Sequence, residues 1–173
     1  RSERALHALE QRDAIYYGET QADARRQLVT DWQQAREAGA STIITTRTNA
    51  QADQLNREIR DQLRERGELA ESGATIAVAH PSRKQERELE FAAGDRIRFG
   101  ARDDNLGVIN GSLGTVQAIE GEGYDARMRV ELDTGAEIDF RAGDHRNQAD
   151  QVALRHAYAL SVDAAQGATV DRA

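Results

Sequence analysis

The first part of the chain alternates helical spacing with one short β-branched run. Apolar residues at 24, 28, 32 and 35 predict a helix that follows a capping-box pattern at 20–23 and ends at Gly39. The same spacing at 52, 55, 59 and 63 follows a second capping pattern at 48–51. Between them, the run 42–46 predicts a buried strand. With a shorter helix expected at 2–11 and a strand at 15–17, this order predicts an α/β domain with a parallel sheet.

The second part of the chain has the period of short antiparallel strands. We expect strands at 75–78, 96–99, 114–119, 126–132 and 137–140, with glycine turns at 120–123 and 133–135. Such strands within about 50 residues predict a small closed barrel, because closure removes exposed edges. Residues 156–160 predict one buried strand that returns to the α/β domain. The expected organisation is an α/β domain (1–84), an inserted barrel (85–146) and the returning α/β segment (147–173).

Length and composition limit the class of protein. The 173 residues fit one domain, or one domain with an insertion. Because cysteine is absent, disulfides, thiolate zinc sites and cysteine nucleophiles are excluded. No apolar stretch is long enough for a membrane span or signal peptide, so we expect a cytoplasmic protein. The chain begins with arginine and stops within a motif-like stretch, so we expect it to be a piece of a larger protein.

Charge is unevenly distributed along the chain. Residues 103–144 contain ten acids and three arginines, and this segment carries the whole net charge of −7. An acidic domain binds polyanions poorly, so a nucleic-acid contact would need a local basic strip. The best candidate combines six basic residues (Arg83, Lys84, Arg87, Arg96, Arg98 and Arg102). Acids are interleaved with them, so an ordinary solvated surface is the alternative.

Several common catalytic arrangements are absent from the sequence. No G-x-x-x-x-G-K-[ST] phosphate loop and no H-E-x-x-H metal motif is present. The four histidines are scattered, and His145 and His156 fit surface or packing positions better than metal ligation. We identify no nucleophile with its base, so no catalytic residue is assigned in this chain.

Arg47 is the first candidate for ligand binding. It lies between the end of a predicted buried strand and the capped start of a helix. Ligands bind at the carboxyl edge of parallel sheets, and a helix start offers free N–H groups to an anion. An arginine there can bind a phosphate in a bidentate manner. The alternative is an arginine that pairs with Asp13 or another nearby acid.

The second candidate is the long loop within 99–116, which is rich in glycine and asparagine and contains Asn110-Gly111. Loops of this kind on a rigid scaffold often bind ligands. The alternative is a plain hairpin whose glycines only satisfy the backbone.

Taken together, these segments resemble a superfamily 1 DNA helicase of the RecD-like branch, most closely the helicase part of conjugative relaxases of the TraA/TraI type. Residues 42–56 resemble helicase motif IV and its following helix, and 91–116 resemble the opening of an SH3-like insertion. Residues 156–172 resemble motif V, and 1–40 fit the approach to the second RecA-like domain. The resemblance covers most of the chain, and the order of the motifs is more specific than any single one.

The resemblance implies roles for individual residues. Arg47 matches an arginine that reaches the γ-phosphate of ATP, and Gly167 lets the backbone approach closely at the ATP site. Three motif V residues match positions that face single-stranded DNA or link it to the nucleotide (Ser161, Gln166 and Thr169). Four residues of the insertion are candidates for holding the strand (Arg98, Arg102, Asn105 and Asn110). Asp163 departs from the pattern, because relatives often have a histidine there.

The resemblance also implies what lies outside this chain. The Walker A lysine, the acidic Mg²⁺ motif, the relaxase residues and the motif VI arginine are not within 1–173. The parent protein is expected to use ATP and Mg²⁺, whereas this chain alone should bind neither and hydrolyse no ATP. Expected partners are single-stranded DNA, the first RecA-like domain and conjugation machinery. The alternative is a non-catalytic docking or structural module that does not bind DNA.

Overall fold

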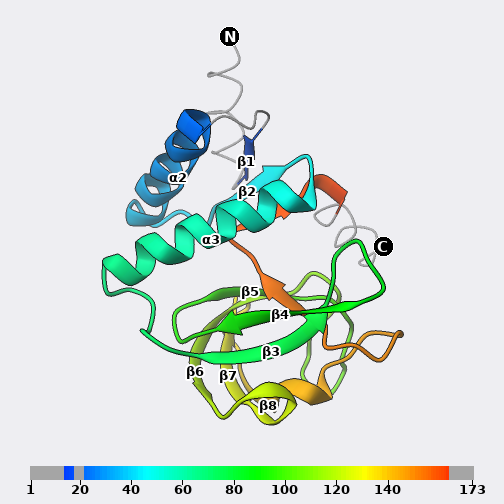
Figure 1. Cartoon of the computed structure of the whole chain (residues 1–173). Coiled ribbons are helices and arrows are strands. Elements are labelled where there is room, and N and C mark those ends of the chain that lie inside the picture. The colour runs from blue at the N-terminus through cyan, green and yellow to red at the C-terminus, as the bar shows by residue number, and fades with distance from the viewer. Residues whose placement is uncertain (1–13, 18–21, 164–173) are drawn as a thin grey trace. The chain divides into compact units, whose positions relative to one another are not determined.

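The computed structural model describes residues 14–17 and 22–163 (Figure 1). The chain divides into two compact units, with boundaries between 61 and 62 and between 157 and 158. The first unit is mixed α/β with a parallel sheet, and the second is built from antiparallel strands. These boundaries differ from the expected ones at 84 and 146. The expected helix at 2–11 lies outside the described residues.

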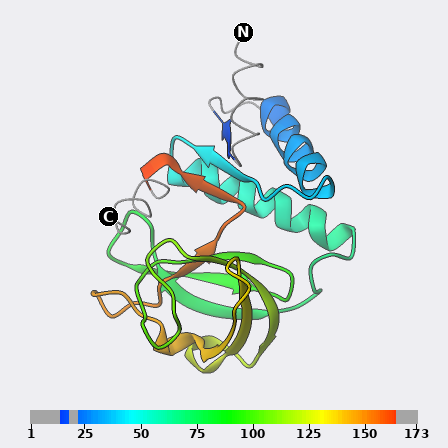
Figure 2. The same ribbon diagram turned by 180° about the vertical axis from the view of Figure 1, so that it is seen from behind.

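The α/β unit contains a three-stranded parallel sheet. Strand β2 (Ile43–Thr46) lies in the centre, between β1 (Ala14–Tyr17) and β10 (Ala159–Ser161). β2 and β10 lie side by side in Figure 1 and again from behind in Figure 2, although more than a hundred residues separate them. The predicted strands at 15–17 and 42–46 are therefore confirmed, and so is the parallel sheet.

Two helices accompany this sheet, and both follow the predicted apolar spacing. Helix α2 (Ala22–Glu37) buries Leu28, Val29 and Trp32. The Trp32 indole Nε1 donates to the Thr42 carbonyl at 3.1 Å, which satisfies its polar group in the core. Helix α3 (Asn49–Glu65) buries positions 52, 55, 59 and 63, as its period predicts. Arg25 of α2 pairs with Glu58 of α3 at 2.7 Å, so the two helices are also joined by charge.

The antiparallel unit has two sheets. Its hairpin pairs β3 (Ala74–Ala79) with β4 (Glu86–Phe91), and β4 was not predicted from the sequence. Its larger sheet has five strands in the order β8-β7-β6-β5-β9. These are β5 (Arg96–Phe99), β6 (Leu113–Glu120), β7 (Arg127–Leu132), β8 (Glu137–Arg141) and β9 (Leu154–His156), with short 3-10 turns at Gly123–Asp125 and Ala142–Asp144.

The predicted closed barrel is not found. Among the described residues no pairing joins β8 to β9, so the five-stranded sheet stays open, and the hairpin forms a separate sheet. Both sheets nevertheless contribute to one hydrophobic core, which includes Ile76 and Phe91 from the hairpin and Phe99 and Val130 from the larger sheet. The hairpin therefore packs against the larger sheet and covers its apolar residues. In a closed barrel, hydrogen bonds would instead join the two edge strands of the sheet.

The apolar run at 156–160 forms two strands instead of the one that was predicted. β9 ends at His156 and pairs antiparallel with β5 of the antiparallel unit. β10 begins at Ala159 and pairs in parallel with β2 of the α/β unit. All five residues of the run are buried, so hydrophobicity alone cannot separate two strands that belong to different sheets.

The turn before β5 shows why the Gly94-Asp95 sequence is needed. Gly94 has a φ of +102°, and a Cβ atom there would lie 2.6 Å from the Glu68 carbonyl oxygen. Asp95 is fully buried, and its Oδ2 accepts a hydrogen bond from the Ala92 amide at 2.9 Å. These two residues therefore serve the backbone of the turn.

Candidate nucleotide and nucleic-acid sites

The carboxyl edge of the parallel sheet brings Arg47 and Ser161 together. Ser161, the last residue of β10, is in register with Thr46, the last residue of β2, and Arg47 follows directly. Ser161 is buried, whereas Arg47 is exposed. Two candidates that are 114 positions apart thus lie at the same sheet edge, where ligands bind in open α/β folds. Gln166, Gly167 and Thr169 lie outside the described residues.

The capping box at the start of α3 forms as the sequence predicted. Gln51 Oε1 accepts hydrogen bonds from the amides of Arg47 and Thr48, each at 3.2 Å, and Thr48 Oγ1 accepts one from the Gln51 amide at 3.1 Å. These contacts satisfy amides that were expected to be free for an anion. The anion-binding capacity of this edge therefore rests on the Arg47 guanidinium, which has no hydrogen bond or ion pair within the described part of the chain.

Asn56 connects the helix behind this edge to the returning strand. Its Nδ2 donates to the Ala159 carbonyl at 3.1 Å, and its Oδ1 accepts from the Ala159 amide at 2.8 Å. Asn56 is only 6% exposed, so both hydrogen bonds are shielded from water. This role was not predicted from the sequence. The sequence contained one indication of it, because Asn56 is a polar amide on the buried face of α3, between Leu55 and Ile59.

The long loop after β5 is anchored by Arg98. This side chain is only 6% exposed, and its guanidinium donates to Asn110 Oδ1 at 3.0 Å. A buried arginine that holds the loop is a positioning residue, and the structure does not place it on the surface where a DNA strand would pass. Arg102 and Asn105 are exposed on the same loop, and Arg102 pairs with Asp104 at 2.7 Å.

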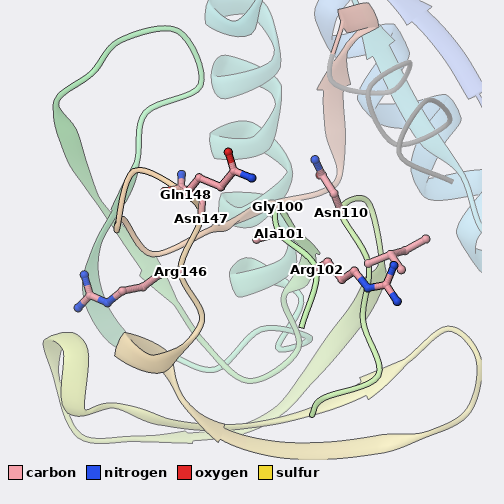
Figure 3. Close-up of a pocket in the computed structure, with 8 residues that line it drawn as sticks. Gly100, Ala101, Arg102, Asn110, Arg146, Asn147 and Gln148 are labelled. Carbon is pink, nitrogen blue, oxygen red and sulfur yellow. The ribbon is translucent and has the colours of Figure 1, made fainter. Parts of the chain in front are cut away.

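Residues from two segments line a pocket of about 540 Å³ in the antiparallel unit (Figure 3). The 100–110 loop contributes the predicted residues Arg102 and Asn110. The turn after Ala142–Asp144 contributes three residues that were not predicted from the sequence (Arg146, Asn147 and Gln148). No sequence motif marked these three, because they meet the loop only through the folding of the sheet.

His145, directly before Arg146 in the chain, is a packing residue. It is 1% exposed and contacts the Phe99 ring edge-to-face, with centroids 5.2 Å apart. Among the described residues neither ring nitrogen has a hydrogen-bond partner, and Asp103 Oδ2 lies 3.9 Å from Nδ1. Burial lowers the pKa of His145 below its ordinary value, although the Asp103 charge opposes the shift. His156 is also buried, and its Nε2 lies 2.7 Å from the Glu90 carbonyl.

We expect His145 to make the protein less stable in acid. The pKa of His145 is lower in the folded chain than in the unfolded chain. Below pH about 6.5 the unfolded chain therefore binds a proton that the folded chain does not, and the free energy of unfolding decreases as the pH is lowered. A single group contributes at most about 1.4 kcal/mol per pH unit. Urea unfolding at pH 7.5 and 5.5 should show a smaller loss for His145→Leu than for the unchanged chain. Equal losses for the two proteins would contradict this expectation.

The described residues contain no group of three or more histidines, aspartates or glutamates that could hold a metal ion. Within the same residues, no helix is both long and apolar enough to cross a membrane.

Known proteins resemble this chain in sequence and in fold. No family model matches the chain. The chain is 33% identical over 172 residues to the conjugal transfer protein TraA of Agrobacterium fabrum. The aligned region covers 98% of this chain and 14% of that protein. The chain is also 30% identical over 154 residues to the probable conjugal transfer protein TraA of Sinorhizobium fredii, covering 89% and 13% of the two chains. The chain thus spans about one seventh of these relatives.

The fold is similar to part of solved Pif1 structures. A crystal structure of Pif1 from Bacteroides sp. in complex with ADP-AlF4 matches with a TM-score of 0.51 at 17% identity, covering 86% of this chain and 37% of Pif1. A double mutant of the Bacteroides Pif1 helicase matches with a TM-score of 0.50. The chain is therefore similar in sequence to conjugal transfer proteins and shares its fold with part of a helicase.

Proposed function

We propose that this chain is part of an ATP-dependent, single-stranded-DNA helicase of superfamily 1 and the RecD-like branch, within a cytoplasmic conjugative relaxase. In this proposal the α/β unit belongs to the second RecA-like domain and supplies one side of the ATP cleft. The antiparallel unit is its SH3-like insertion. The observation that carries the proposal is the common sheet edge of Arg47 and Ser161. The similarity to TraA proteins over nearly the whole chain supports it.

Arg47 is the residue that we assign to the γ-phosphate of ATP. An exposed guanidinium at the carboxyl edge of a parallel sheet fits a phosphate, because it offers paired donors and a fixed charge. Gly167 is assigned to the same nucleotide, and Ser161, Gln166 and Thr169 to the adjacent DNA strand. Bound Mg²⁺ would neutralise phosphate charge, and its ligands would come from elsewhere in the parent protein, as would the first RecA-like domain. This chain alone is therefore proposed to hydrolyse no ATP.

In the antiparallel unit we assign Arg102, Asn105 and Asn110 to the DNA strand, with Arg98 as the residue that positions Asn110. Both side chains of the Arg102–Asp104 ion pair are exposed, so water screens the pair and a phosphate can replace the carboxylate at little cost. The proposed partners are single-stranded DNA and conjugation machinery.

We expect the chain to bind a labelled 20-nucleotide oligo(dT), and we expect salt to weaken the binding. Each phosphate that a cation neutralises contributes a slope of about −0.7 to a plot of log K against log salt, so the one exposed cation that we assign to the strand, Arg102, gives about −0.7. Fluorescence anisotropy between 25 and about 200 mM salt measures this slope. Arg102→Ala should make the slope shallower by about 0.7, which is the contribution of one phosphate contact. Arg57→Ala, which removes an exposed charge from α3, should leave it unchanged.

The alternative is a docking or structural module that does not bind DNA. The net charge of −7 and the burial of Arg98 favour it, because both reduce the cationic surface offered to a strand. If the chain does not bind oligo(dT) at about 25–50 mM salt, the result would support this alternative function and contradict our proposal.

A further inference from the structure

Among the described residues, three side-chain amides and no carboxylate line the pocket in the antiparallel unit. Asn110 comes from the 100–110 loop, and Asn147 and Gln148 come from the turn after Ala142–Asp144. This composition is notable because the segment 103–144, from the same unit, contains ten acids. Figure 3 shows the Gln148 side chain extending from the turn toward the side of the pocket that Asn110 lines.

Hydrogen bonds within the protein fix the orientation of two of these amides. Asn147 Oδ1 accepts from the amides of Ala149 and Gln151, at 2.9 and 3.1 Å. Asn110 Oδ1 accepts from the Arg98 guanidinium at 3.0 Å. Backbone amides and guanidinium groups only donate, so the side-chain oxygens must face them. The NH₂ groups of Asn110 and Asn147 are then the atoms left for a ligand, and both are donors.

The other lining residues add a cation at one side and an apolar wall. Arg102 is exposed and carries the positive charge, and Ile109 supplies an apolar surface. The Arg146 guanidinium lies over the Tyr124 ring, 4.7 Å from its centroid, and it donates to the Gly143 and Asp150 carbonyls. Figure 3 shows this guanidinium pointing away from the other lining side chains, so Arg102 is the cation that a ligand would meet.

We propose that this pocket binds one unpaired nucleotide of a DNA strand and prefers bases with a carbonyl oxygen at C4 of a pyrimidine or C6 of a purine over bases with an amino group at that position. The inference rests on the proposed function and adds selectivity to it. Two fixed donors pair with the O4 of thymine or uracil and the O6 of guanine, whereas the amino groups of cytosine and adenine would face them donor to donor. Ile109 provides a surface for the base, and Arg102 provides a partner for its phosphate.

The size of the pocket favours a nucleotide over a phosphate group alone. About 540 Å³ falls within the range of about 300–1,000 Å³ that holds small organic ligands. A phosphate would use Arg102 and leave the amide donors on the opposite segment without a partner.

Homopolymers of deoxyuridine and deoxycytidine provide the test, because their bases differ only at C4, an oxygen in one and an amino group in the other, and at the adjacent N3, which carries a hydrogen only in uracil. We expect the 173-residue chain to bind oligo(dU) about fivefold more tightly than oligo(dC) of the same length at the same salt concentration, which is toward the lower end of single-site base discrimination. Fluorescence anisotropy with 20-nucleotide strands gives both affinities. Equal affinities would overturn the proposal.

Asn147→Asp is the most direct variant. Its carboxylate still accepts from the Ala149 and Gln151 amides, so the turn is retained, while the side-chain NH₂ donor is replaced by an acceptor oxygen. We expect the oligo(dU) preference to disappear or reverse. The added negative charge weakens both strands alike and cancels in the ratio. Gln34→Glu, which adds the same charge on an exposed position of α2, should keep the fivefold ratio.

The outcomes separate this inference from the proposed function. If neither strand binds at low salt, the proposed DNA contact fails, and the selectivity fails with it. If both strands bind with the expected salt dependence but equally, or if Asn147→Asp leaves the ratio unchanged, the pocket does not read the base and only the inference fails.

Discussion

Replacing Asn56 by alanine is expected to lower the free energy of unfolding of the 173-residue chain by about 2–5 kcal/mol. The Asn56 side chain satisfies both the amide and the carbonyl of Ala159 in the buried interior of the α/β unit. Without it both backbone groups lose their partners, and each unsatisfied buried group costs about 1–3 kcal/mol. This loss is a large fraction of the roughly 5–15 kcal/mol that stabilises a typical domain.

Urea unfolding followed by far-UV circular dichroism measures the loss of stability. Hydrogen exchange at the Ala159 amide gives a local readout, and we expect its protection to fall most, because this amide loses its acceptor. Arg57→Ala is the matched control on the exposed face of the same helix, and it should change stability by no more than about 0.5 kcal/mol. If Asn56→Ala also changes the free energy of unfolding by no more than this amount, the two hydrogen bonds do not stabilise strand β10.

Replacing Arg47 by alanine is expected to reduce ATP hydrolysis by the proposed parent protein at least about 100-fold. Arginines that meet the transferring phosphoryl group contribute about 10³–10⁵-fold to turnover, because they stabilise charge that develops in the transition state. The effect should appear mainly in kcat, with a smaller change in KM. Lysine should not restore the rate, because an ammonium group lacks the paired donors of the guanidinium.

The fold should tolerate this change, since the exposed Arg47 side chain makes no hydrogen bond or ion pair within the described part of the chain. DNA-stimulated phosphate release is the measurement, with unchanged urea unfolding as the check on folding. Arg57→Ala again serves as the control, because it removes an exposed arginine from α3 at a position away from the sheet edge. Turnover that stays within about twofold after Arg47→Ala would contradict the assignment of the nucleotide site.

The amino-acid sequence determined the local elements of this protein. The positions of α2, β2 and α3 follow from apolar spacing and a capping box, because these signals act between residues a few positions apart. The same local reasoning placed Arg47 between a strand and a helix, and it identified the 100–110 loop, which supplies half of the pocket.

Only the tertiary structure decided which elements pair and which side chains meet. The five buried residues at 156–160 are shared between two sheets, and the strands expected to close a barrel form an open sheet with a separate hairpin. Arg98 and Arg102 were both predicted to hold the DNA strand, yet Arg98 is buried against Asn110 and Arg102 is exposed. Such outcomes depend on contacts between residues far apart in the chain, and the local pattern of apolar and polar positions carries no information about them.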